Sequence, residues 1–295
     1  MKTFNTLLLR EWMQYRWGWM AIILIPIVVL LALVPFSQVS GLDALTPEPV
    51  ALISAALTMG LVMALTLAST FYQLMSMPRR DQQDRSIEFW KSLPGSDSQS
   101  LAAPLLAHGV LLPLCALVLA MAGGAVVGVA MTFKELGLDG LRQMQWLGVG
   151  HAALWLLARL TLGLVLALLW LSPFVLALMA AGAWLKRWGA PLLMFGVGGL
   201  IKLYDGKGAM TVLVRQFEGA RISIVSGAPG LASFPEGTHD FPIEELYEAL
   251  YRFPDWAPQD MLLGLQSAAA PQFVGGLLVA AACFGLMVWQ RRRVV

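Results

Sequence analysis

The chain has 295 residues, of which 58% are hydrophobic and 13% charged, and its formal net charge is +2. Soluble domains carry about 25% charged residues, and a chain of this length has too little interior to bury so much apolar surface. The composition therefore excludes a soluble fold for most of the chain and predicts an all-α, polytopic membrane protein with about six transmembrane helices. No basic run is long enough to indicate nucleic-acid binding, and two cysteines within apolar runs exclude a disulfide scaffold.

Residues 1–18 are predicted to form an amphipathic helix on the cytoplasmic membrane surface. Apolar and aromatic side chains recur there at helical spacing, and basic and amide side chains fall on other faces. The apolar set is Phe4, Leu7, Leu8, Trp12, Tyr15 and Trp19. The alternative is an ordinary solvated helix start, but the tryptophans favour the interface. The next apolar run, 19–39, is expected to be the first span and not a signal peptide, because it is longer than an h-region and further spans follow.

Two further spans are predicted on either side of a polar segment. The second span covers 50–77, the polar segment covers 78–100, and the third span covers 101–133. Small residues in the third span predict close packing against a neighbouring helix, because they let two backbones approach. They are Gly123, Gly124 and Gly128.

The apolar stretch 146–184 is longer than one span, and Pro173 interrupts it. It fits either two spans with a tight turn at Ser172-Pro173, or an interfacial segment followed by one kinked span. Lysines and arginines concentrate in short cytoplasmic loops, and only the one-span arrangement leaves all the basic segments on that side. We therefore expect one span, with Arg159 near its outer end reaching to the lipid headgroups. The alternative is that Arg159 is a functional charge within a transport pathway.

The C-terminal third is predicted to contain a short fifth span, 190–204, an external connector, 205–270, and a last span, 271–289, closed by three arginines. The connector is polar and acidic in balance. It is expected to be loop-like, apart from a short helix at 243–251 that Pro242 would start. Residues 1–295 are thus expected to form a single transmembrane domain with one external insertion.

The sequence contains no recognisable catalytic motif. A Walker A loop is absent, because Gly206-Lys207 lacks both the earlier glycine and a following serine or threonine. No His-Glu-x-x-His zinc motif and no Gly-x-Ser-x-Gly nucleophile elbow occur. Charges are scarce within the spans, which argues against an ion-coupled transporter. We therefore expect no enzyme activity, no metal and no cofactor in this chain.

The polar segment 78–100 carries the most informative pattern. Asp84 is a good N-cap and Pro94 a good stop, so about two to three turns of helix are predicted between them. Aromatic side chains, Phe89 and Trp90, stand beside charged ones there. Such a mixture is typical of a docking surface for a protein partner. The alternative, equally weighted from the residues alone, is a loop packed on the protein's own membrane surface.

The segment from Asp84 to Pro94, followed by Ser96-Asp97, resembles the loop after the second span in permease subunits of type-2 ATP-binding-cassette (ABC) transporters. The segment from Ser172-Pro173-Phe174 to Lys186-Arg187 also resembles that family, in which a proline-broken fourth helix ends in aromatic and basic residues. The layout of an N-terminal amphipathic helix and about six spans agrees over nearly the whole chain. Gly95 departs from the pattern, because an aliphatic residue is expected there.

The resemblance implies a membrane subunit that pairs with a separate ATPase. Two permeases, in a homodimer or a heterodimer, would assemble with two copies of the ATPase subunit, which would bind ATP and Mg²⁺. The chain would lie in the bacterial cytoplasmic (inner) membrane with both termini in the cytoplasm. It would form the pathway of an exporter and would contact membrane lipid. The Met-, Leu- and Trp-rich composition of the spans suits a hydrophobic or amphipathic cargo, and it equally suits plain contact with lipid.

The resemblance also assigns roles within the chain. Segment 78–100 would contain the coupling helix, seated in a groove of the ATPase, with Phe89 and Trp90 as its anchors. The implied contact set is Asp84, Arg85, Ser86, Ile87, Glu88, Phe89, Trp90, Lys91 and Leu93, in which Arg85, Glu88 and Lys91 would form ion pairs at the rim. The N-terminal helix would act as an elbow at the membrane surface, through Leu8, Trp12 and Tyr15.

Two other functions stay open. A membrane-embedded lipid-modifying enzyme would need acidic or histidine metal ligands near the interface, for which Asp81 with Asp84 is the only candidate pair. A non-transporting assembly or signalling subunit would use the acidic connector 205–270 as its partner site.

Overall fold

The structure is a computed structural model that describes residues 2–37, 46–83, 96–185, 207–224 and 250–293, with isolated residues in between. Within these residues every regular element is a helix. Five helical segments are long and apolar enough to cross a membrane: Phe4–Phe36, Pro47–Met77, Asp97–Gln143, Trp146–Leu185 and Pro271–Arg293. The predicted multi-pass helical architecture is thus confirmed. The predicted fifth span, 190–204, lies outside the described residues except for isolated positions.

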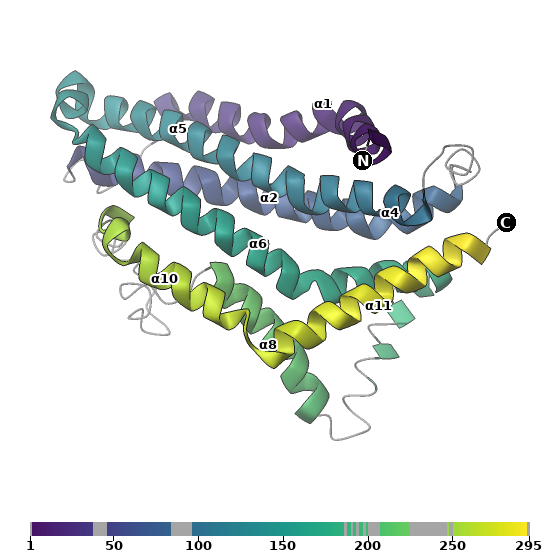
Figure 1. Ribbon diagram of the computed structural model, residues 1–295. Coiled ribbons are helices and arrows are strands. Elements are labelled where there is room, and N and C mark those ends of the chain that lie inside the picture. Colours follow the sequence, from purple (N-terminus) through teal and green to yellow (C-terminus); the bar gives the residue numbers. More distant parts are fainter. Residues whose placement is uncertain are drawn as a thin grey trace.

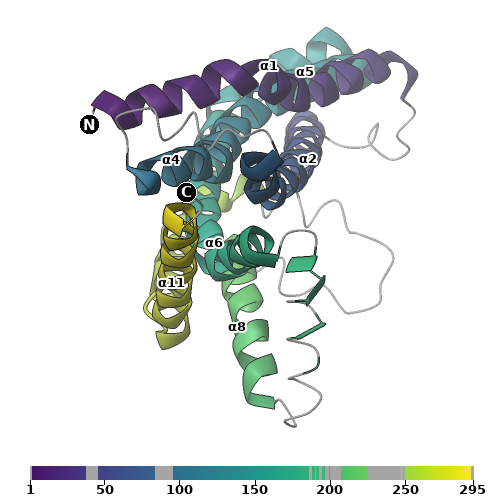
Figure 2. The same ribbon diagram turned by 90° about the vertical axis from the view of Figure 1, so that its right-hand side faces the viewer.

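Helix α1, Lys2–Leu33, contains both the predicted surface helix and most of the first span without a break at residue 18. Its first turns run across the direction of the other long helices, and its later turns run alongside α5 (Figures 1 and 2). A short 3-10 turn, Val34–Phe36, ends it.

Helix α2, Pro47–Gln83, and helix α5, Leu112–Gln143, form the most extensive helix pair of the bundle. Two glycines of α5 make this possible, as the sequence predicted. A Cβ atom at Gly124 would lie 2.7 Å from the carbonyl oxygen of Ala55, and one at Gly128 would lie 2.5 Å from that of Ala51. Only glycine lets the two backbones approach so closely.

The third span begins earlier than predicted. Helix α4, Asp97–Leu106, starts at a capping box between Ser96 and Gln99. A π-helical turn, Ala107–Leu111, then joins α4 to α5. Pro113 lies just beyond this turn and has no amide hydrogen to donate to the preceding turn. Wider turns of this kind relieve such a mismatch, and they often lie at functional sites.

Helix α6, Trp146–Leu185, is one helix of 40 residues with Pro173 inside it. There is no turn at Ser172-Pro173, so the alternative of two spans joined by a tight turn there is wrong. At 1.5 Å per residue the helix is about 60 Å long, roughly twice the thickness of the hydrocarbon core. Because transmembrane helices rarely tilt beyond about 40°, part of α6 must extend past that core.

The connector 205–270 was predicted to be loop-like, and this is wrong for its described parts. Helix α8, Lys207–Ile224, and helix α10, Phe253–Ser267, both pack on α6. Gly219 on α8 faces the ring of Trp170 on α6, so a Cβ there would clash with the indole. Of the predicted helix 243–251, only three positions are described, and they are helical.

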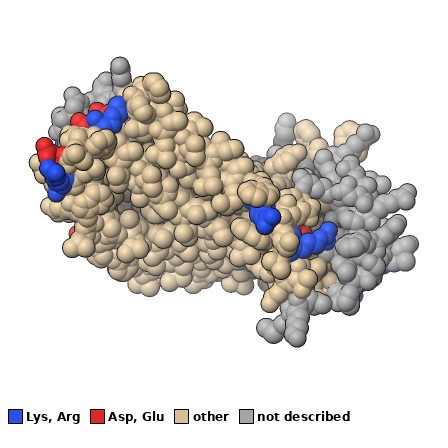
Figure 3. Space-filling model, turned by 90° about the horizontal axis from the view of Figure 1, so that it is seen from above, with Lys and Arg blue, Asp and Glu red and all other residues tan. Residues whose placement is uncertain are grey.

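Helix α11, Pro271–Arg293, packs along the C-terminal half of α6, whereas α10 lies along its N-terminal half (Figure 1). The side-chain amide of Gln290 donates to the carbonyl of Ala183, which fixes the ends of α11 and α6 together. Charged side chains gather at the two ends of the face seen in Figure 3, with a broad uncharged surface between them. This surface is suited to contact with lipid chains.

Candidate functional site

One end of the bundle collects the start of α1, the end of α2, the start of α4 and the end of α11 (Figure 1). The Arg291 guanidinium donates to the hydroxyl of Ser100, 2.9 Å away. Arg292 lies 3.9 Å from the carboxylate of Asp97. The first residues of α4 therefore lie beside the C-terminal arginines of α11. We call this end of the bundle the basic end.

The predicted coupling-helix contacts, from Asp84 to Leu93, all lie outside the described residues. The structure describes the helices that flank them. The last turn of α2 ends at Gln83, and the capping box at Ser96 starts α4.

The three predicted elbow residues, Leu8, Trp12 and Tyr15, fall on α1 near the basic end. Leu8 and Tyr15 pack against the core formed with α2 and α5. Trp12 is 41% exposed, and its ring lies 5.6 Å from that of Trp19. One face of the first turns is therefore held by the bundle, while the indole of Trp12 keeps a surface open to the interface.

A buried acid–imidazole pair joins the first turns of α1 to the π-helical turn. The Nε2 atom of His108 lies 3.4 Å from the carboxylate of Glu11, and both side chains are buried. The ring of His108 contacts Tyr15 and Trp19 edge-on, at centroid distances of 4.8 and 5.3 Å. Its other nitrogen, Nδ1, has no hydrogen-bond partner among the described residues.

Sequence reasoning did not find this pair, although each member carried a signal. Glu11 is the only acidic residue before position 43, and it interrupts an otherwise apolar and basic helix. His108 stands within an apolar span. Because ionisable side chains are rarely buried unless paired, both were candidates for a partner.

Arg159 does not reach the lipid headgroups, so that prediction is wrong. Its side chain is almost fully buried, and its Nε donates to the carboxylate of Asp260 on α10. Its Nη1 donates to the backbone carbonyl of Ser223 on α8. One guanidinium thus ties α6 to α8 and α10, which supply the oxygens that the headgroups were expected to provide. We call this the Arg159 cluster.

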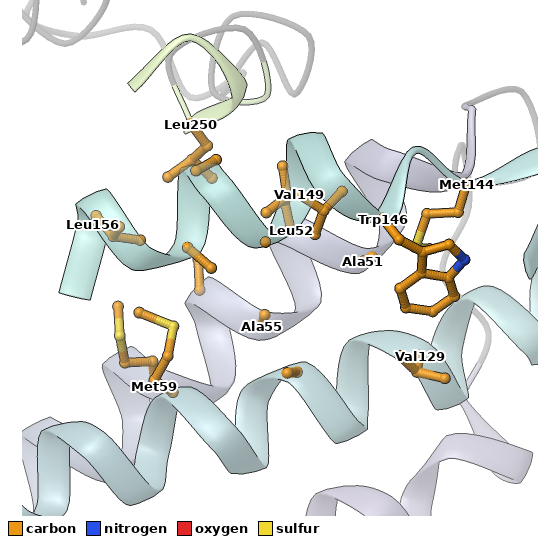
Figure 4. A pocket seen from close by; sticks show the side chains of 16 residues that line it. Ala51, Leu52, Ala55, Met59, Val129, Met144, Trp146, Val149, Leu156 and Leu250 are labelled. Atoms are coloured by element: carbon orange, nitrogen blue, oxygen red, sulfur yellow. The ribbon is translucent and has the colours of Figure 1, made fainter. Parts of the chain in front are cut away.

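An apolar cavity of about 220 Å³ lies between α2, α5 and α6 (Figure 4). Small side chains on α2 and α6 leave the space, and larger ones lie at its two ends. Met144 and Trp146 lie at one end, and Met59 and Leu156 at the other (Figure 4). The sequence does not predict this cavity, because a cavity depends on how three helices cross.

In the part of the chain that the structure describes, no group of three or more His, Cys, Asp or Glu side chains could hold a metal ion. The side chains of the acidic pair predicted for a membrane enzyme, Asp81 with Asp84, lie outside those that the structure describes.

Comparison with protein families, with curated proteins and with solved structures found no match to this chain. The resemblance to ABC permeases therefore rests on the sequence segments themselves.

Proposed function

We propose that this chain is the membrane-spanning subunit of an ATP-driven transporter of the type-2 ABC class, coupled to a separate ATPase. The observation that carries the proposal is the segment Asp84–Pro94, with its aromatic and charged residues, inserted between the last turn of α2 and the first turn of α4. Its sequence resembles the coupling segment of that family. The chain has no Walker A loop of its own, so the energy would come from a partner.

The mechanical surroundings of the segment suit such a role. A push on residues 84–95 would act on α2 and α4 together, because both helices end there. The movement would pass to α5, since α2 packs backbone to backbone against Gly124 and Gly128. Rigid packed helices transmit displacement better than loops do.

The described flanks also favour a sixth crossing. The end of α6 lies beside the end of α11 through Ala183 and Gln290, and α8 lies beside the start of α11 through Gln216 and the carbonyl of Gln272. Residues 183 and 216 therefore lie beside opposite ends of α11, and a crossing between them would account for this. The 18 residues from Gln272 to Gln290 rise about 27 Å, close to one bilayer core.

Six crossings would leave both termini on the same side. By the positive-inside rule that side would be the cytoplasm, because Arg291, Arg292 and Arg293 and the basic residues of segment 78–100 would then be cytoplasmic. We propose that two copies of the ATPase, with bound ATP and Mg²⁺, dock at the basic end, and that a second permease, identical or different, completes the complex. The direction would be export from a bacterial cytoplasm.

The first test is to purify the tagged protein from detergent-solubilised native membranes and to identify the subunits that accompany it. A Walker-motif ATPase in roughly equal amount is expected. Phe89→Ala and Trp90→Ala should each reduce its recovery several-fold and uncouple ATP hydrolysis from the transporter. Phe36→Ala is the matched control, because Phe36 is 81% exposed at the other end of α1.

Wild-type recovery of the ATPase with Phe89→Ala and Trp90→Ala would remove the coupling-helix assignment. Purification of the chain without any ATPase would remove the transporter proposal and place the membrane-embedded enzyme first. A metal-dependent activity of the isolated chain would then be sought at Asp81 and Asp84.

A further inference from the structure

The cavity between α2, α5 and α6 results from the sizes of the residues at which these helices meet. Gly124 and Gly128 of α5 lie against the backbone of Ala55 and Ala51 of α2, so no gap remains between these two helices. The same α2 turns present Ala51, Leu52, Ala55 and Ala56 to the cavity. On α6 the lining includes Gly150 and Ala153. Their side chains are too small to fill the space between α6 and the α2–α5 pair.

The lining carries no charged, amide or hydroxyl side chain. Its one polar side-chain atom, the indole nitrogen of Trp146, donates to the carbonyl of Leu141 at 3.1 Å. A water molecule in a cavity needs two to four polar partners, and none is offered here. Apolar cavities of about 150 Å³ stay dry and take up small hydrocarbons, so 220 Å³ has room for a hydrocarbon segment.

One end of the cavity adjoins polar groups. Gln145 lies between the lining residues Met144 and Trp146, and its backbone N–H donates to the carboxylate of Glu48 at 3.0 Å. The hydroxyl of Tyr251 donates to the side-chain oxygen of Gln145 at 2.7 Å. The site is therefore polar at one end and apolar along its length, as an amphiphile is.

We propose that this cavity holds an acyl chain of a membrane phospholipid, with the headgroup beside Glu48, Gln145 and Tyr251. Phospholipid is the solvent of the broad uncharged surface of the bundle (Figure 3), so this occupant is present at high concentration. Methionines at Met59 and Met144 adapt to chains of differing shape, because the thioether side chain is flexible and polarizable. The inference goes beyond the proposed function and does not rest on it.

The test uses the full chain in lipid nanodiscs with phosphatidylethanolamine that carries a photoreactive diazirine on one acyl chain. Labelled residues are located by mass spectrometry. A diazirine near the headgroup is expected to label the Met144–Trp146 end, and one at the terminal carbon the Met59–Leu156 end. Labelling without this order, or labelling no stronger than on the exposed face of α11, would overturn the proposal.

A filling variant tests the same point independently. Gly150 lines the cavity, and a Cβ atom there meets nothing within 4 Å, so Gly150→Leu places its side chain without a backbone clash. It should lower the labelling of cavity residues at least several-fold. Gly60→Leu is the matched control, since Gly60 on α2 also meets nothing within 4 Å and does not line the cavity.

Unchanged cavity labelling in Gly150→Leu would count against the acyl chain. Should that variant fail to fold, the order of labelling in the wild-type chain still decides. Labelling that disappears only when a partner ATPase hydrolyses ATP would assign the cavity to a transported cargo and would overturn a resident lipid.

Discussion

The guanidinium of Arg159 on α6 pairs with the carboxylate of Asp260 on α10, although the two residues are 101 positions apart in the sequence. Both side chains are buried, and the carbonyl of Ser223 on α8 accepts a second hydrogen bond from the same guanidinium. Buried charges persist only when they are paired and hydrogen-bonded. Helices α8 and α10 are therefore part of the packed bundle, and the Arg159 cluster holds them against α6.

Removing one partner of the Arg159 cluster should destabilise the protein strongly. Asp260→Ala would leave a buried, uncompensated guanidinium, which typically costs about 3–5 kcal/mol. The measurement is the thermal unfolding midpoint in detergent. Asp255→Asn is the control, because Asp255 is exposed on the same helix.

The double variant Arg159→Met, Asp260→Leu should recover most of the stability lost by Asp260→Ala, because apolar residues can replace a buried ion pair with little loss. A double variant as unstable as Asp260→Ala would show that the two side chains do not act as a pair.

The long helices could be predicted from sequence, because an apolar run of about 20 residues has few alternatives in a membrane. The close contacts of Gly124 and Gly128 could also be predicted, because small residues within an apolar span are a local pattern in the sequence. The Arg159 cluster was not. Its carboxylate lies in α10, where Pro254 and Pro258 hide the helical pattern, and nothing in the spacing links positions 159 and 260.

Two further features of the structure could not be predicted from the sequence. The π-helical turn that points His108 at Glu11 is a small departure from regular helix, and sequence patterns do not resolve it. The cavity reflects the crossing of three helices. The predicted coupling segment, by contrast, was indicated by its residue pattern and given its role by resemblance, and it stays a prediction, because residues 84–95 lie outside the described part of the chain.

Adding a single methyl group to the α2–α5 contact should destabilise the bundle. Alanine normally stabilises a helix by about 1 kcal/mol relative to glycine. In Gly128→Ala that gain is opposed by a Cβ atom 2.5 Å from the backbone oxygen of Ala51, which cannot move aside as a flexible side chain would.

The two effects are separated by Gly275→Ala on α11, where a Cβ atom meets nothing within 4 Å. We expect Gly275→Ala to keep or raise the unfolding midpoint and Gly128→Ala to lower it. Equal midpoints for the two variants would contradict the close α2–α5 contact.

The buried pair of Glu11 and His108 should stabilise the docking of the elbow on the π-helical turn. Glu11→Ala leaves the imidazole without its acceptor, and an unsatisfied buried polar group costs about 1–3 kcal/mol. Protease accessibility of the N-terminal segment and the unfolding midpoint are the measurements.

Gln14→Ala is the control for this pair, since Gln14 is exposed and donates a hydrogen bond to the hydroxyl of Tyr15 at 3.4 Å. Replacing both members, as in Glu11→Leu with His108→Phe, should cost less than Glu11→Ala alone, because no polar group is then left unpaired. If Glu11→Ala and Gln14→Ala behave alike, the pair contributes nothing to docking.

The orientation of the bundle can be tested with single cysteines in a variant whose native thiols, Cys115 and Cys283, are replaced by alanine. Ser86→Cys and Val295→Cys should react with a membrane-impermeant maleimide only after spheroplasts are lysed, and Gly230→Cys should react before lysis. The reason is that short segments rich in lysine and arginine stay in the cytoplasm, and Arg291–Arg293 and the basic residues of 78–100 form such segments. Labelling of Ser86→Cys in intact spheroplasts would reverse the orientation and leave no cytoplasmic ATPase a surface to dock on. Labelling at both 230 and 295 before lysis would instead mean that α11 does not cross the membrane.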